Sequence, residues 1–404
     1  MSFENLGLSA PLMRAVDALK YATPTPIQAK AIPVALAGSD LVGLAETGSG
    51  KTASYLLPIL QRIAGGEGLR ALVLAPTREL ALQIDQVATT LAEHTGLRSV
   101  CVVGGMSMNA QIQKLRAGVD LCIATPGRLL DHVRSGEIWL DQISELVLDE
   151  ADRLLDMGFL PDIRRITQRV PRSRHTMLFS ATLSAEVEGL AYELLRDPKT
   201  IEIGRRARTV GTLDQVAYSV LGHHKTPLLL RLAEERIDGQ ALVFARTKKS
   251  CDIVARALKA HGHAVELMHA DRSQQQRIAA LDRFKKGKVK MLVATDLAAR
   301  GIDIEDVAYV VNYDIPATVD DYVHRCGRTA RAGRSGTAMT FVAPTEALTM
   351  RDFERATGAP ITIETVDNFS DGRSPADAAA AFLASLHTEG SAPAARPFGR
   401  RGRR

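Results

Sequence analysis

The 404-residue sequence predicts an α/β fold with two similar halves, each a mostly parallel sheet flanked by helices. Short runs of β-branched residues and leucine alternate with longer segments of helical period, which favours an open α/β sheet in each half. Several of these runs are apolar throughout, as is typical of strands buried on both faces of a parallel sheet. At about 100–200 residues per domain, the length also fits two or three domains.

The expected strands come in two series. In the first half they lie near residues 41–44, 71–74, 99–103, 121–124, 146–148 and 176–179. In the second half they lie near residues 241–244, 265–268, 291–293, 309–311 and 338–342. Ligands of open α/β sheets usually bind beyond the carboxyl ends of the strands, so functional residues are expected directly after these runs.

A loose stretch, GRRARTVGT, separates the two series. We therefore expect a first domain at residues 1–205, a linker at 206–212, a second domain at 213–366 and a flexible tail at 367–404. Within the tail, Ser374-Pro375 is expected to begin a short alanine-rich helix that continues to Leu386.

Composition narrows the class of protein. The apolar fraction of 46% is ordinary for a globular chain, and the absence of an 18-residue apolar run argues against a membrane-spanning helix. The start, MSFENLGLSA, lacks the features of a secretory signal. The four cysteines are scattered without metal-ligand spacing, which suits reduced thiols. We therefore expect a cytoplasmic protein with no membrane partner.

The net charge of +5 is unevenly distributed. The last nine residues, RPFGRRGRR, contain five arginines and no acid, which equals the whole surplus. The rest of the chain is balanced, so only this segment suggests affinity for a polyanion.

The sequence AETGSGKT, residues 45–52, follows an expected strand and precedes a helical segment. Glycines let backbone N–H groups turn toward phosphate oxygens, and the next helix adds its positive dipole end. Lys51 is placed to reach the terminal phosphates and Thr52 to ligate Mg²⁺. The alternative is an ordinary Gly/Ser turn. The predicted nucleotide-binding residues here are Ala45, Glu46, Thr47, Gly48, Ser49, Gly50, Lys51 and Thr52.

Three acidic residues, Asp149, Glu150 and Asp152, directly follow another expected strand. Asp149 is placed to hold the metal of a bound nucleotide, and Glu150 to orient or deprotonate the attacking water. Asp152 is a candidate for coupling the site to other groups. The alternative is a solvated acidic helix start, where such residues are common.

Asp149-Glu150-Ala151-Asp152 spells the motif of the DEAD-box RNA helicases, and motifs along residues 1–345 resemble that family in order. The resemblance implies two tandem RecA-like domains and an ATP-dependent RNA helicase, closest to bacterial RhlE-like members. Residues 21–28, YATPTPIQ, resemble the family's Q motif, with Phe3 at the upstream aromatic position. By resemblance Gln28 reads adenine and Tyr21 stacks on it; read alone, the segment is a helix start capped by Thr25.

Further motifs resemble the family's RNA-contacting segments. Hydroxyl, guanidinium and glycine N–H groups after strands suit phosphate contacts without base readout, although a tetrapeptide such as TPGR alone is a common turn. The implied RNA-binding residues are Pro76, Thr77, Arg78, Gly105, Thr125, Gly127 and Arg128 in the first half, and Arg246, Gln274, Arg277, Thr295, Arg300 and Gly301 in the second.

The resemblance also assigns residues that connect the two halves. Ser180 and Thr182, with Asp152 and His324, would couple hydrolysis to strand separation, and Asp303 would contact the ribose. Arg328 and Arg331 would reach the γ-phosphate across the cleft, where an arginine finger contributes about 10³–10⁵ in rate. The alternative is a solvated basic loop, but Arg325, Arg328 and Arg331 would share one face if they were helical.

Four positions depart from the family pattern. Glu46 replaces a common glutamine, which puts a carboxylate near the phosphates. Ala270 and Ala330 stand where glycine is usual, and Cys326 where an aliphatic residue is usual. None of these changes removes a charged or liganding group.

We therefore expect an RNA-stimulated ATPase, with ATP and Mg²⁺ as cofactors, that unwinds short RNA duplexes or remodels RNA–protein complexes. The alternatives are an ATP-gated RNA clamp or assembly platform, and a DNA helicase on the same two domains. The expected partner is RNA, single-stranded or as short duplex, with ribosomal or RNA-decay proteins as further candidates, and the expected state is a monomer.

Overall fold

The computed structural model describes residues 2–45, 48–203, 213–299, 304, 307–330, 335–343 and 346–365. The expected linker and the expected helix at residues 376–386 lie outside the described residues, so both stay predictions. No helix in the described ranges combines the length and the apolar character that crossing a membrane requires.

The described chain forms two seven-stranded sheets, and every strand pair in them is parallel. The first sheet has the order β3-β4-β2-β5-β6-β1-β7 and the second β10-β11-β9-β12-β13-β8-β14. The two orders become identical when the strands of each half are numbered from its own first strand. The strands are β1 Leu41–Leu44, β2 Ala71–Leu74, β3 Ser99–Val102, β4 Leu121–Ala124, β5 Glu145–Leu148, β6 His175–Ser180, β7 Lys199–Glu202, β8 Leu213–Ser219, β9 Ala241–Phe244, β10 Val265–Met268, β11 Met291–Ala294, β12 Tyr309–Asn312, β13 Gly336–Val342 and β14 Thr362–Thr365.

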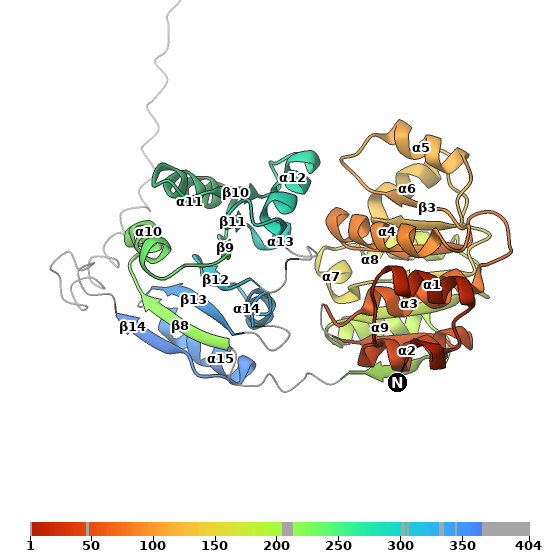
Figure 1. Cartoon of the computed structure of the whole chain (residues 1–404), viewed down its shortest axis with the longest axis horizontal. Coiled ribbons are helices and arrows are strands. Elements are labelled where there is room, and N and C mark those ends of the chain that lie inside the picture. The colour runs from red at the N-terminus through yellow and green to blue at the C-terminus, as the bar shows by residue number, and fades with distance from the viewer. Residues whose placement is uncertain are drawn as a thin grey trace, which may run out of the picture.

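Helices flank both sheets (Figure 1). In the first half they are η1 Phe3–Leu6, α1 Ala10–Ala18, α2 Pro26–Leu36, α3 Lys51–Arg62, α4 Arg78–Ala92, α5 Met108–Arg116, α6 Pro126–Arg134, α7 Ala151–Asp156, α8 Leu160–Thr167 and α9 Ala185–Leu194. In the second half they are η2 Gly222–His224, α10 Lys225–Glu235, α11 Lys248–Ala260, α12 Gln274–Lys285, α13 Asp296–Ala299, α14 Val319–Cys326 and α15 Ala347–Thr357. The two-domain α/β architecture expected from the sequence is confirmed.

Each sheet has an apolar core on both faces. In the first half, one core packs β1 and β2 against α1–α4, and another packs the opposite faces of the same sheet against α6–α9. Strands β2 and β4 are buried at every position, which explains their continuously apolar sequences. β5 is equally buried but begins with Glu145, which pairs with Arg62 and His175. The sheets therefore act as rigid supports, and the segments after the strands carry the polar groups.

All eleven expected strands are present, but three strands were missed. β7 and β14 each lie at one edge of a sheet, where a strand needs little apolar sequence; β7 is KTIE, with three of four residues exposed. β8 contains Gln215, which is buried but has hydrogen-bond partners in Thr357, Ala359 and Tyr322. Its polar pattern hides a buried strand, because side-chain partners replace apolar packing.

Candidate active site

The strand order brings the first half's charged motifs to one edge. The phosphate loop follows β1 and the acidic motif follows β5, while β6 lies between these strands and ends at Ser180. The RNA-type motifs follow β2, β3 and β4, at the other half of the same edge. The strand order thus places the nucleotide-type motifs at one half of this edge and the RNA-type motifs at the other, although the two kinds alternate along the chain.

The phosphate loop turns sharply into α3. Gly48 and Gly50 have φ values of 78° and 92°, in the left-handed region that favours glycine. A Cβ at Gly50 would lie 2.5 Å from Gln28 Nε2, so only glycine fits there. Lys51, the first residue of α3, is buried and donates to the Ala45 carbonyl oxygen at 2.7 Å. Glu46 and Thr47 lie outside the described residues, so their expected roles stay predictions.

The Q-motif segment supports this loop directly. Gln28 Nε2 donates to the Gly50 carbonyl at 3.2 Å, and Gln28 Oε1 accepts from the Thr25 N–H at 2.9 Å within a capping box. Tyr21 stacks on Phe3 with ring centroids 6.4 Å apart. The capping interpretation of this segment is therefore confirmed. The Gln28 amide, which is expected to bind adenine, is bonded to Gly50 at the end of the phosphate loop.

Asp149 is a buried carboxylate with both oxygens bonded. Oδ2 accepts from the Tyr55 hydroxyl at 2.8 Å, and Oδ1 from the Glu150 N–H at 2.9 Å. Burial raises the pKa of Asp149 to about 6, while the nearby Lys51 charge opposes that rise. A cation beside Asp149 therefore favours its ionised form. Tyr55, four residues after Lys51 in α3, was missed because its spacing reads only as a core position.

Glu150 has a strained backbone. Its φ is 50° and its ψ 56°, a left-handed conformation that non-glycine residues rarely adopt. The side chain is 6% exposed and accepts from Arg153 at 2.9 Å, in a buried ion pair. The strain falls on the residue expected to handle the attacking water, which is where enzymes commonly keep it.

Asp152 ties the acidic motif to the end of β6. Its Oδ2 accepts from the N–H groups of Ala181 and Thr182 at 3.0 and 3.1 Å, and from the Thr182 hydroxyl at 3.2 Å. Ser180 is fully buried beside them. The expected coupling set of the first half therefore forms one contiguous hydrogen-bonded unit.

The two halves meet around a small cavity. Arg153, the partner of Glu150, lines it together with Phe244, Asp296, His324, Arg325 and Arg328 of the second half. Asp152 precedes the lining residue Arg153, and His324 itself lines the cavity. The two residues thus lie on opposite sides of one junction. The predicted finger Arg328 is 3% exposed at this junction, whereas Arg331 and Asp303 lie outside the described residues.

The helical face expected for three arginines is not formed by Arg325 and Arg328, and Arg331 lies outside the described residues. α14 ends at Cys326 and Gly327 caps it, so Arg328 follows the helix and does not continue its face. Arg325 instead holds Asp296 through two bonds of 2.6 and 2.7 Å and the Asp314 carbonyl at 2.7 Å. Its guanidinium also lies 5.0 Å from the Phe244 ring centroid. Arg325 therefore fixes the loop ends of the second half.

The RNA-type residues of the first half gather after β2, β3 and β4. Thr77, next to Pro76, caps α4 by accepting from the Leu80 N–H at 3.3 Å, and Thr125 begins α6. Arg78 packs over Gly105, where a Cβ would lie 2.3 Å from its guanidinium. Arg128 donates to the Met106 carbonyl at 3.2 Å, and nothing lies within 4 Å of a Cβ built at Gly127.

In the second half the equivalent strands β9, β10 and β11 carry Arg246, the Gln274–Arg277 segment and Thr295. Arg246 donates to the Ile315 carbonyl at 3.1 Å, and the buried Thr295 precedes α13. Arg300 and Gly301 lie outside the described residues. Both sheets thus place their RNA-type motifs on the same half of the carboxyl edge.

A direct bridge joins the two halves. Glu79, buried at the start of α4, accepts from Gln274 at 2.8 Å and from Arg277 at 3.2 Å. Two residues expected at RNA are therefore in contact with the other half in this arrangement. Glu79 was missed as a site residue, since a glutamate in the first turn of a helix is ordinary.

Comparison with known proteins identifies the family of the chain. The sequence model described as DEAD/DEAH box helicase matches residues 25–190, and that described as Helicase conserved C-terminal domain matches residues 224–333. The DEAD-box ATP-dependent RNA helicase CshA of Geobacillus kaustophilus is 40% identical over 357 residues, covering 88% of this chain and 76% of the relative. The Bacillus subtilis CshA is 39% identical over 358 residues, covering 88% and 72%.

Solved structures match across both halves. Saccharomyces cerevisiae Dbp5 bound to RNA and ADP BeF3 has a TM-score of 0.81 and 30% identity, covering 95% of this chain and 99% of that chain. A variant of Dbp5 bound to a variant of Gle1 and IP6 has a TM-score of 0.73 and 30% identity, covering 96% and 98%. The arrangement described above is thus more similar to the RNA-bound form, and the chain belongs to the DEAD-box ATP-dependent RNA helicases.

Proposed function

We propose that hydrolysis in this helicase depends on closure of the two halves over ATP and RNA. The observation that carries this proposal is the buried Glu150–Arg153 pair, because Arg153 also lines the cavity with Arg328. The carboxylate that handles water is thus one side chain away from the second half. Arg328, and the predicted Arg331, would supply charge to the γ-phosphate only when the halves meet.

Mg²⁺ is the second part of the proposal. The Thr52 hydroxyl and the Asp149 carboxylate are hard oxygen donors, which suits a cation that binds few carboxylates together with phosphates. When bound, the ion neutralises charge on the phosphates. Lys51 binds the phosphate chain, Glu150 orients the water and accepts its proton, and burial of the site excludes other water.

RNA completes the site through its backbone. The grouping of Arg78, Thr125 and Arg128 with Arg246 and Thr295 on matching sheet halves offers a path for one strand's phosphates. Binding one strand in this path would displace its complement locally, which unwinds a short duplex or removes a bound protein. We propose that the protein acts as a monomer in the cytoplasm and belongs to an RhlE-like subclass. Its proposed protein partners are ribosomal or RNA-decay proteins.

The first test is steady-state ATP hydrolysis with and without single-stranded RNA, and with single-stranded DNA of matched length as the control. We expect strong stimulation by RNA and little by DNA. Hydrolysis that no nucleic acid affects would mean that another partner closes the halves. Measuring duplex separation and RNA retention with the same preparation separates a helicase from an RNA clamp, because a clamp retains RNA without separating strands.

A further inference from the structure

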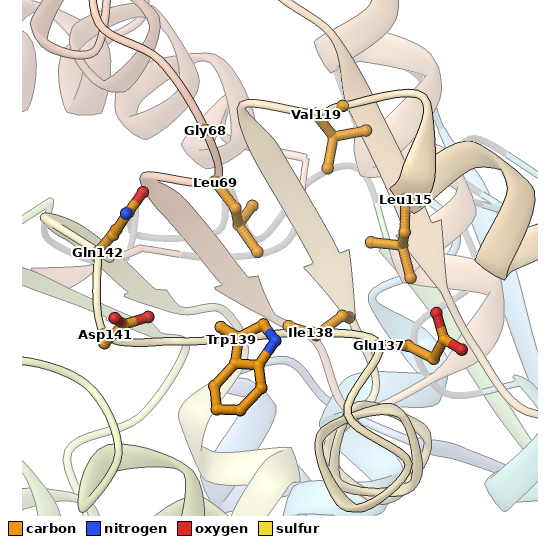
Figure 2. Close-up of a pocket in the computed structure, with 10 residues that line it drawn as sticks. Gly68, Leu69, Leu115, Val119, Glu137, Ile138, Trp139, Asp141 and Gln142 are labelled. Carbon is orange, nitrogen blue, oxygen red and sulfur yellow. The ribbon is translucent and has the colours of Figure 1, made fainter.

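The first sheet has a pocket at its amino edge, opposite to the active site. It lies before β2, β4 and β5 and has a volume of about 350 Å³, at the lower end of the range for ligand sites (Figure 2). Leu69, Leu115 and Val119 face the segment that carries Ile138 across the hollow (Figure 2). We call it the Trp139 pocket, after the residue beside Ile138.

Trp139 is the chain's single tryptophan, and its side chain is 74% exposed. Large aromatic side chains at the rim of apolar pockets are the residues that most often dominate binding between protein segments. Exposing an indole next to a preformed hollow costs solubility, unless another group covers both. The pocket therefore fits an aromatic side chain that packs beside Trp139.

The rim is acidic. Glu137 and Asp141 flank Trp139, and Asp141 is exposed (Figure 2). Glu137 pairs with Arg116 at 2.8 Å, but the Arg116 side chain is 70% exposed, so solvent screens this pair. Glu67, also exposed, adjoins the lining residue Gly68. A basic segment that carries an aromatic residue would match this rim and hollow.

We propose that residues 396–404 of the same chain, RPFGRRGRR, dock in the Trp139 pocket. Phe398 fills the hollow, and the arginines lie against Glu137, Asp141 and the face of the indole. This segment is the one stretch of the sequence that has five arginines in nine residues, together with a phenylalanine. The docking goes beyond the helicase activity, because the pocket lies at the sheet edge away from ATP and RNA.

The connection is long enough. From Thr365 at the end of β14, residues 366–398 can extend to about 110 Å, whereas a compact body of about 360 residues, the size of both halves together, has a radius of gyration of only about 21 Å. A tethered segment has an effective concentration on the order of 1 mM. A segment with a dissociation constant of about 1 mM would therefore be docked in about half of the molecules.

Trp139 fluorescence tests the proposal, since all tryptophan emission comes from this pocket. Acrylamide quenching is measured on the full chain, on a chain ending at residue 395, and on Phe398→Ala, with Phe382→Ala as the matched tail control. We expect the full chain and Phe382→Ala to be quenched about half as efficiently as the other two. Equal quenching of the full and the shortened chain overturns the proposal.

Two further measurements sharpen the result. Glu137→Gln with Asp141→Asn should remove the protection, as should salt near 1 M, whereas Glu188→Gln on α9 should not. Protection that survives the double substitution would contradict the acidic rim. Protection that increases with protein concentration would mean that the segment docks in a second copy, and the intramolecular proposal would be wrong.

Discussion

The two halves have the same strand order, yet only one has a phosphate loop. In the first half α3 begins with Lys51-Thr52 after β1, and in the second α10 begins with Lys225-Thr226 after β8. Lys51 donates to a backbone carbonyl, whereas Lys225 forms a 3.1 Å ion pair with Asp314. The second lysine is thus neutralised by its own half.

The next position repeats the contrast. β5 is followed by Asp149 and Glu150, and the equivalent β12 is followed by Tyr313 and Asp314. The Tyr313 hydroxyl pairs with Thr226 at 2.8 Å, where the first half has a carboxylate and a threonine. The comparison teaches that the fold alone does not make a nucleotide site. In the first half, Lys51 and Asp149 influence each other electrostatically without forming the direct ion pair that Lys225 and Asp314 form in the second.

The largest expected effect comes from Glu150→Gln. The change keeps the size of the side chain but removes its charge and basicity, so turnover should fall by about 10²–10⁴-fold while ATP binding persists. Turnover is followed by phosphate release and binding by a fluorescent nucleotide. Normal turnover in this variant would remove Glu150 from its role and leave the comparison without a catalytic carboxylate.

A paired substitution compares the two lysines. Lys51→Gln should lower hydrolysis by about 10²–10³-fold, since one buried cation near the developing charge is lost. Lys225→Gln should leave hydrolysis nearly unchanged but lower stability by about 1–3 kcal/mol, because the two side chains are only 12% and 19% exposed and Asp314 would lose its cation. ATP hydrolysis and urea unfolding of both variants measure this. Equal losses of hydrolysis would contradict the asymmetry between the halves.

Asp149→Asn tests the cost of the buried carboxylate. The folded chain raises the pKa of Asp149 from 3.8 to about 6, so folding favours the protonated form. That stability is present below pH 4 and is lost as pH rises through 6. Without nucleotide or Mg²⁺, the unfolding free energy of the variant, relative to that of the natural chain, should therefore rise by about 3 kcal/mol between pH 4 and 6. A difference in unfolding free energy that does not vary with pH would contradict this account.

The sequence predicted the central strands well because full burial leaves a continuous apolar run, as in β2 and β4. It also predicted Asp149, Glu150 and Asp152, since a motif and its strand are adjacent in the chain. It could not predict Tyr55 or Glu79, whose partners Asp149 and Gln274 are distant in sequence. Contacts of that kind depend on the strand order and on how the halves meet, and neither is written in local spacing.

The smallest expected effect concerns backbone strain. Each half contains a non-glycine residue in the left-handed conformation close in sequence to a residue that lines the cavity between the halves. Glu150 has a φ of 50° and Ala330 one of 56°. Strain at Glu150 positions a catalytic group, but the methyl group of Ala330 has no such role. The left-handed conformation costs an alanine about 1–2 kcal/mol, and glycine removes this cost. Glycine also makes the unfolded chain more flexible, which offsets part of the gain, so Ala330→Gly should stabilise the protein by about 1 kcal/mol.

Ala270 is the matched control, because glycine is also usual there but its φ is not positive. Ala270→Gly should gain nothing and should lose about 0.5–1 kcal/mol, since only the unfolded chain becomes more flexible. Thermal unfolding of the two variants decides between these effects, with a shift of about 2–4 °C for each kcal/mol in a domain of this size. If both variants changed stability alike, the departure at Ala330 would carry no strain, and the left-handed backbone of Glu150 would be the single strained position of the pair.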